Sequence, residues 1–78
     1  MSLTLERRTH LAAGAAYRWH RERIRTYEDL MVERQDGTPE SIREASAEYH
    51  TAICYWVLVT IHVETLVKQL DAGIGATP

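Results

Sequence analysis

The segment Gln35-Asp36-Gly37-Thr38-Pro39 decides the fold, because helix-stop, turn and helix-start signals fall within this short stretch. Gly37 is typical of the left-handed residue that closes a helix. Thr38 followed by Pro39 indicates an N-cap with proline at the first helical position, where the missing N–H costs nothing. The segment therefore predicts two antiparallel helices joined at this turn.

The sequence on either side of the turn supports two long helices. The first is expected over about residues 4–34, where Gly14 is the sole internal glycine and no proline occurs. The turn is expected over 35–38, the second helix over about 39–72, and a frayed tail over 73–78. Helices of about 30 residues are typical of bundles and coiled coils. We expect one all-α, helical-hairpin domain over residues 1–78.

The second helix carries the clearest pattern, a 3-4 spacing of apolar residues over four heptads. We interpret these positions as the core of an oligomer: Ile42, Ala45, Tyr49, Ala52, Trp56, Val59, Val63, Leu66 and Leu70. Residues 53–67 are also rich in β-branched types that alternate as in a strand. The heptad pattern continues beyond both ends of that alternation and no second strand is available to pair with it, so a helix is favoured.

The first helix has two neighbouring apolar stripes. One contains Ala13, Tyr17, Ile24, Tyr27 and Met31, and the other contains Ala12, Ala16, Trp19 and Leu30. Folding the hairpin about Gly37 pairs positions whose numbers add to roughly 73. The small residues at 12–16 are then expected opposite residues 57–61.

The middle of the second helix is apolar on every side. A second apolar face lies off the heptad stripe and is made of Cys54, Val57, Leu58 and Ile61. A helix that is apolar all round is normally buried all round, and one partner helix cannot cover it. We therefore expect the hairpin to associate into a homodimeric four-helix bundle or a higher oligomer. The alternative is a docking groove for another protein.

Composition narrows the possible functions. The chain has 78 residues, one cysteine and a net charge of −2. A domain of this size usually needs a disulfide, a metal or oligomerisation for stability, and a single cysteine excludes an intramolecular disulfide. The charge favours neither nucleic acid nor an acidic surface as partner. The apolar run over 52–59 is too short to cross a bilayer, so we expect a cytoplasmic protein with no membrane partner.

An arginine-rich segment offers the best candidate ligand site. Arg18, Arg21 and Arg25 lie near Trp19, and arginine beside an aromatic ring can hold a phosphate and stack a base. Acidic residues lie among these arginines at three- and four-residue spacings that suit ion pairs within the helix. A solvated, salt-bridged face is therefore the competing interpretation.

Metal binding and catalysis have weaker support. The pairing about the turn places His10 near His62 and His20 near Cys54, and both imidazole and thiolate are metal ligands. Neither a Glu-x-x-His pair of the di-iron type nor a His-Glu-x-x-His motif occurs. Cys54 is expected among apolar side chains, which raises a thiol pKa and makes it inert. No cofactor is expected.

The sequence thus favours a non-enzymatic interaction or regulatory protein that associates with itself and binds another macromolecule, most simply another protein. The alternative is a binder of nucleic acid or of a phosphate-bearing ligand through residues 18–25. A metal-binding helical bundle ranks third.

Overall fold

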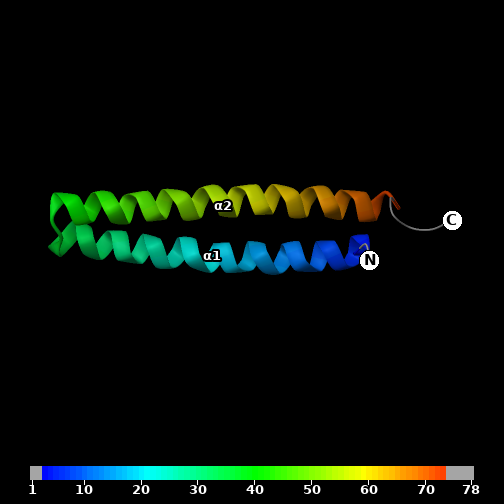
Figure 1. Cartoon of the computed structure of the whole chain (residues 1–78), viewed down its shortest axis with the longest axis horizontal. Helices are drawn as coiled ribbons and strands as arrows, with labels where there is room; N and C mark the ends of the chain where they lie inside the picture. The colour runs from blue at the N-terminus through cyan, green and yellow to red at the C-terminus, as the bar shows by residue number, and fades with distance from the viewer. Residues whose placement is uncertain (1–2, 74–78) are drawn as a thin grey trace.

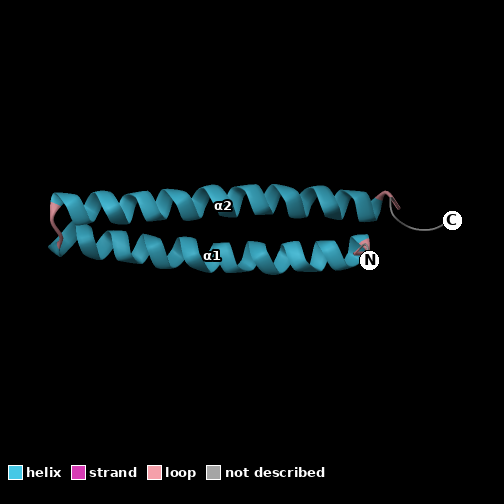
Figure 2. Cartoon of the chain, in the orientation of Figure 1, coloured by secondary structure: helices cyan, strands magenta, loops and turns pink. Residues whose placement is uncertain are grey.

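The chain folds as two antiparallel α-helices that lie side by side (Figure 1). The computed structural model describes residues 3–73. Helix α1 spans Leu5–Asp36 and helix α2 spans Pro39–Asp71, and Figure 2 shows helix along nearly the whole described length. The predicted all-α hairpin is confirmed. The molecule measures 60 × 22 × 14 Å, so it is a single layer of two helices.

The turn is shorter than the sequence suggests, because α1 continues to Asp36 and leaves only Gly37 and Thr38 outside the helices. The expectation of a left-handed Gly37 is wrong: its φ of −91° and ψ of 175° are extended. Space explains this glycine instead. A Cβ there would lie 2.5 Å from both the Glu33 carbonyl oxygen and the Ser41 hydroxyl. The left-handed residue is Gly73, with φ 75°, just after α2.

Side-chain caps fix where both helices begin. The Thr38 hydroxyl accepts a hydrogen bond from the Ser41 backbone N–H (3.1 Å), and the Ser41 hydroxyl accepts one from the Thr38 N–H (2.8 Å). This reciprocal pair satisfies two backbone donors that a helix start otherwise leaves free. At the start of α1, the Thr4 hydroxyl accepts from the Arg7 N–H (3.1 Å).

The register between the helices differs from the expected one by about two positions. The rings of Trp19 and Tyr55 pack together, as do those of Tyr27 and Tyr49. The residue numbers of these two pairs add to 74 and 76, whereas the sequence predicted a sum of about 73. The cause is the longer α1, since a turn at 37–38 moves the centre of the hairpin by one residue.

The core is small. Among the described residues, the buried side chains are Thr26, Leu30, Ala45, Ala52 and Leu66. Thr26 is polar, and its hydroxyl donates to the Glu22 carbonyl (2.8 Å) within its own helix, which satisfies the group without a partner across the interface. Four buried apolar side chains are few for a domain that must offset the conformational entropy of about 70 ordered residues.

Candidate interaction surfaces

One side of α2, here called the inner face, carries the nine heptad residues. Ala45, Ala52 and Leu66 are buried, and the other six are half-buried: Ile42, Tyr49, Trp56, Val59, Val63 and Leu70. Tyr49 and Trp56 contact rings of α1, at centroid distances of 5.5 Å to Tyr27 and 6.2 Å to His20. These nine residues therefore pack within one hairpin.

The second apolar face is exposed to solvent. Cys54, Val57, Leu58 and Ile61 are all exposed, with Leu58 at 62% and Ile61 at 55%. These positions lie on the side of α2 that points away from α1, because they fall about half a helical turn from Ala45 and Ala52. The apolar environment expected for Cys54 is therefore absent in the isolated hairpin.

Helix α1 uses the second of its two apolar stripes against α2. Leu30 is buried and Trp19 is half-buried, whereas Tyr17, Ile24 and Tyr27 of the other stripe are exposed at 61%, 42% and 47%. Met31 of that other stripe is half-buried, and Tyr27 keeps a contact with Tyr49 of α2. Helix α1 consequently also leaves apolar surface in contact with water.

Two aromatic contacts that the sequence did not predict join the helices. Trp19 stacks on Tyr55 with centroids 4.8 Å apart and planes 18° from parallel. The guanidinium of Arg23 lies 4.3 Å from the ring centre of Trp56, within the range of a cation–π contact. Trp56 therefore lies between Arg23 and His20 rather than in a purely apolar core.

Trp56, Arg23 and His20 form a cluster between the helices. Two polar atoms of this cluster lack a hydrogen-bond partner among the described residues. They are the Nδ1 atom of His20 and the Nε atom of Arg23, and both atoms are buried. A buried donor without an acceptor costs free energy. The cluster is therefore the least satisfied part of the interface between α1 and α2.

The arginines of the candidate ligand site have different surroundings. Arg25 donates to both Glu22 and Asp29, and its Nη1–Asp29 Oδ2 distance is 2.9 Å. The hydrogen bond from Arg25, together with its charge, holds the pKa of Glu22 below its usual range. Arg21 approaches the ring of Tyr17 at 6.0 Å, and Arg18 is exposed. Trp19 stacks on Tyr55 and, together with Arg18 and Glu22, lines an open hollow on α1.

The histidines do not form a metal cluster with other ligands. Within residues 3–73, no group of three or more His, Cys, Asp or Glu side chains is placed to hold an ion. His10 and His62 are displaced by the shift in register, and the ring of His20 faces Trp56 instead of Cys54.

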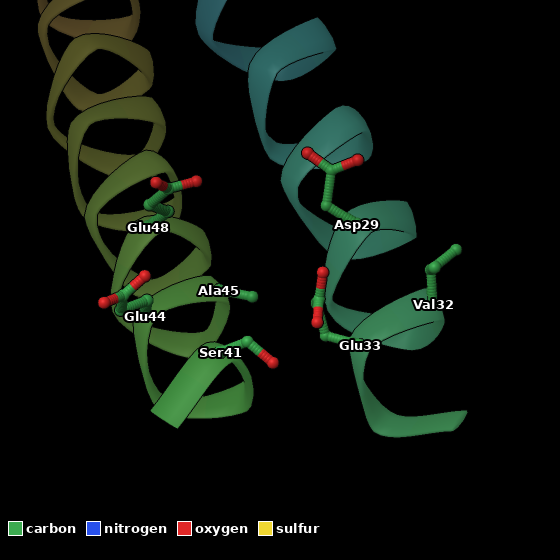
Figure 3. A pocket seen from close by; sticks show the side chains of 7 residues that line it. All are labelled: Asp29, Val32, Glu33, Ser41, Glu44, Ala45 and Glu48. Carbon is green, nitrogen blue, oxygen red and sulfur yellow. The ribbon is translucent and has the colours of Figure 1, made fainter. Parts of the chain in front are cut away.

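A shallow acidic hollow lies between the helices near the turn (Figure 3). Its lining includes four carboxylates from both helices: Asp29, Glu33, Glu44 and Glu48. Arg25 neutralises Asp29 from outside the hollow.

Helix α2 is also long and apolar enough to span a bilayer by length and composition. Its mean hydropathy over the most apolar window is 1.3, and 11% of that window is buried in the hairpin. A single helix of this kind is weak evidence for a membrane, and it does not identify what covers the apolar side chains of α2.

Comparisons with known proteins add no family to these observations. No protein-family model, no curated protein and no solved structure matches the chain. Any functional assignment must therefore come from the surfaces described above.

Proposed function

We propose that this chain is a non-enzymatic interaction protein that works as a self-associated helical bundle and binds another macromolecule in that form. The observation that carries the proposal is the exposed second apolar face of α2. Leu58 and Ile61 are exposed at 62% and 55%, and Val57 at 40%. Large apolar side chains gathered on one face of a soluble protein generally mark an interaction site.

The shape of the hairpin supports the proposal. Its radius of gyration is 17.3 Å, whereas a compact domain of this length is expected near about 11.5 Å. A layer one helix thick covers each helix on one side only. Packing a second layer against it would cover the exposed apolar residues, and it would supply the core that a single hairpin lacks.

Ligand binding through residues 18–25 is supported less well. Arg25 is engaged by two carboxylates of its own helix, and Trp19 is stacked on Tyr55. A phosphate would have to compete with these contacts. Metal binding likewise lacks a cluster of ligands within the described residues.

The native mass of the purified chain tests the proposal. Sedimentation equilibrium over a wide concentration range is expected to give a dimer or larger species, with helix content falling as the species dissociates. A folded monomer at all concentrations would contradict the proposal. Co-purification of one stoichiometric protein would identify the macromolecular partner.

A further inference from the structure

The outward side of α2 carries a continuous exposed row, here called the outer stripe. Its members follow 3-4 spacing and every one of them is exposed: Arg43, Ala47, His50, Cys54, Val57, Ile61, Glu64, Lys68 and Asp71. Its apolar middle extends over 54–61, and Leu58 flanks that middle. Ionisable side chains lie on both sides of it. This arrangement is that of a helix–helix seam with polar ends.

Two pairs of ionisable groups in the outer stripe are placed symmetrically about Val57 with opposite signs, while Lys68 has no ionisable counterpart because its symmetric position holds Ser46. Arg43 lies two heptads before Val57 and Asp71 two heptads after it. His50 lies one heptad before Val57 and Glu64 one heptad after it. Arg43 and His50 thus precede Val57 at the same intervals at which Asp71 and Glu64 follow it, the intervals being about 21 and about 10 Å along the helix axis.

We propose that a second copy of the chain docks on the outer stripe with its α2 antiparallel and the two-fold axis at Val57. This inference rests on the proposed function and specifies its geometry. An isologous contact brings residue i of one copy against residue j of the other and the reverse. Around Val57, that operation places Arg43 against the partner's Asp71, and His50 against the partner's Glu64, twice each.

The hydrogen bonding of His50 suits this contact. Its Nδ1 atom lies 2.7 Å from the Ser46 carbonyl oxygen, and a carbonyl can only accept, so Nδ1 carries a proton. His50 is an exposed residue of the outer stripe, and Nε2 is its second ring nitrogen. When the ring is protonated, Nε2 can donate to a carboxylate on the facing copy.

A parallel arrangement has the opposite electrostatics. Each residue of the stripe would then face its own counterpart, so Arg43 would face an arginine, Glu64 a glutamate and Lys68 a lysine. Like charges across a helix seam oppose association, and complementary ones favour it. The two helix dipoles also attract each other only when the helices are antiparallel. Charge complementarity therefore selects one orientation of one occupant, a second copy.

A lipid bilayer is the competing occupant of the same apolar residues. Glu64 and Lys68 lie within the outer stripe and close to its apolar middle. A bilayer would have to accept these charges near its hydrocarbon core, which is costly. The facing copy instead places the partner's His50 against Glu64, while Lys68 lies opposite the partner's Ser46.

Disulfide cross-linking tests the orientation, and the natural chain provides its own control. In the antiparallel seam the two Cys54 residues are offset by six positions, about 9 Å along the axis, which is beyond disulfide reach. In a parallel seam they would face each other. We expect the C54A/V57C chain to form a disulfide-linked dimer under mild oxidation at low concentration, while the natural chain forms none above the level of random collision.

The outcomes separate the two proposals. Rapid cross-linking of the natural chain without cross-linking of C54A/V57C would overturn the antiparallel geometry. A stable dimer in which neither chain cross-links would place the interface elsewhere, and it would overturn this inference while leaving the proposed function intact. A monomeric native mass would overturn both the proposed function and the antiparallel dimer. Binding of the chain to vesicles of neutral lipid would overturn both as well.

Charge reversal tests the register independently. Arg43→Asp or Asp71→Arg alone is expected to raise the dimer dissociation constant about 3- to 10-fold at low salt, since two exposed ion pairs become repulsive. The double variant is expected to recover the natural value, because the signs are exchanged together. Failure of the double variant to recover would overturn the register, since a parallel seam predicts no rescue.

Discussion

The inner and outer faces of α2 differ in a way that explains how the hairpin is built. Of the three buried positions of the inner face, two hold alanine, Ala45 and Ala52, and the third holds Leu66. The outer stripe and its flank have large side chains at open positions, with Leu58 exposed at 62%. Small residues let two helices approach closely but bury little apolar area. Helix α2 thus packs closely against α1 through its inner face, while most of its exposed apolar surface lies on the other side.

The largest expected effect comes from the inner face. Leu66 is 1% exposed, so Leu66→Ala is expected to cost about 2–5 kcal/mol by leaving a cavity. With so few buried side chains, most of the helix content should be lost at every protein concentration. Circular dichroism during denaturant titration measures this change. An unchanged midpoint of denaturant unfolding in the Leu66→Ala variant would show that the inner face does not hold the helices together.

A substitution beside the outer stripe is expected to weaken self-association rather than to unfold the hairpin. Leu58→Asp introduces an unpaired charge beside the outer stripe, and it is expected to raise the dissociation constant at least about 30-fold, or about 2 kcal/mol. Sedimentation equilibrium measures it. Val32→Asp is the matched control, because Val32 is a similarly exposed side chain, at 58%, on α1. Equal effects of the two substitutions would remove the distinction between the two faces.

Two glycines, Gly37 in the turn and Gly14 within α1, are expected to respond differently to substitution by alanine. Gly37 lacks space for a Cβ atom, whereas Gly14 has that space and only lowers the helix propensity of α1. Gly37→Ala is expected to destabilise the hairpin by about 1–2 kcal/mol, since the new Cβ meets the Glu33 carbonyl and the Ser41 hydroxyl. Gly14→Ala is expected to stabilise it by about 0.5–1 kcal/mol, because only the Arg18 side chain approaches, at 3.9 Å. Thermal unfolding compares the two, and effects of the same sign would contradict the role given to Gly37.

The smallest expected effect is electrostatic and lies on neither face of α2. The pKa of Glu22 is lowered by Arg25 in the folded chain, so its ion pair contributes stability above the ordinary carboxyl pKa of 4.5. That contribution is lost as pH falls through the lowered value. Glu22→Gln should therefore lower the melting temperature slightly at pH 7, and the difference should vanish at strongly acidic pH. A difference that persists there would assign the effect to packing.

The candidate surfaces were predictable in part. The position of the turn at Thr38 and Pro39, the long uninterrupted helices and the division of α2 into two apolar sides all follow from residue order. The stacking of Trp19 on Tyr55 and the placement of Arg23 over Trp56 did not follow, because each depends on how long side chains reach across the closed hairpin, which residue numbers alone do not give. The unsatisfied His20 nitrogen had no signal in the sequence for the same reason.

The two helices follow from residue order, because caps, proline and apolar spacing act within a few residues of one another. Only the tertiary structure decided which stripe of α1 packs on α2. Both stripes have helical spacing, and the choice depends on which one fits against Ala45 and Ala52. The tertiary structure also explained Gly37, since its need for space arises from Glu33 and Ser41, which belong to different helices and meet only once the hairpin has closed.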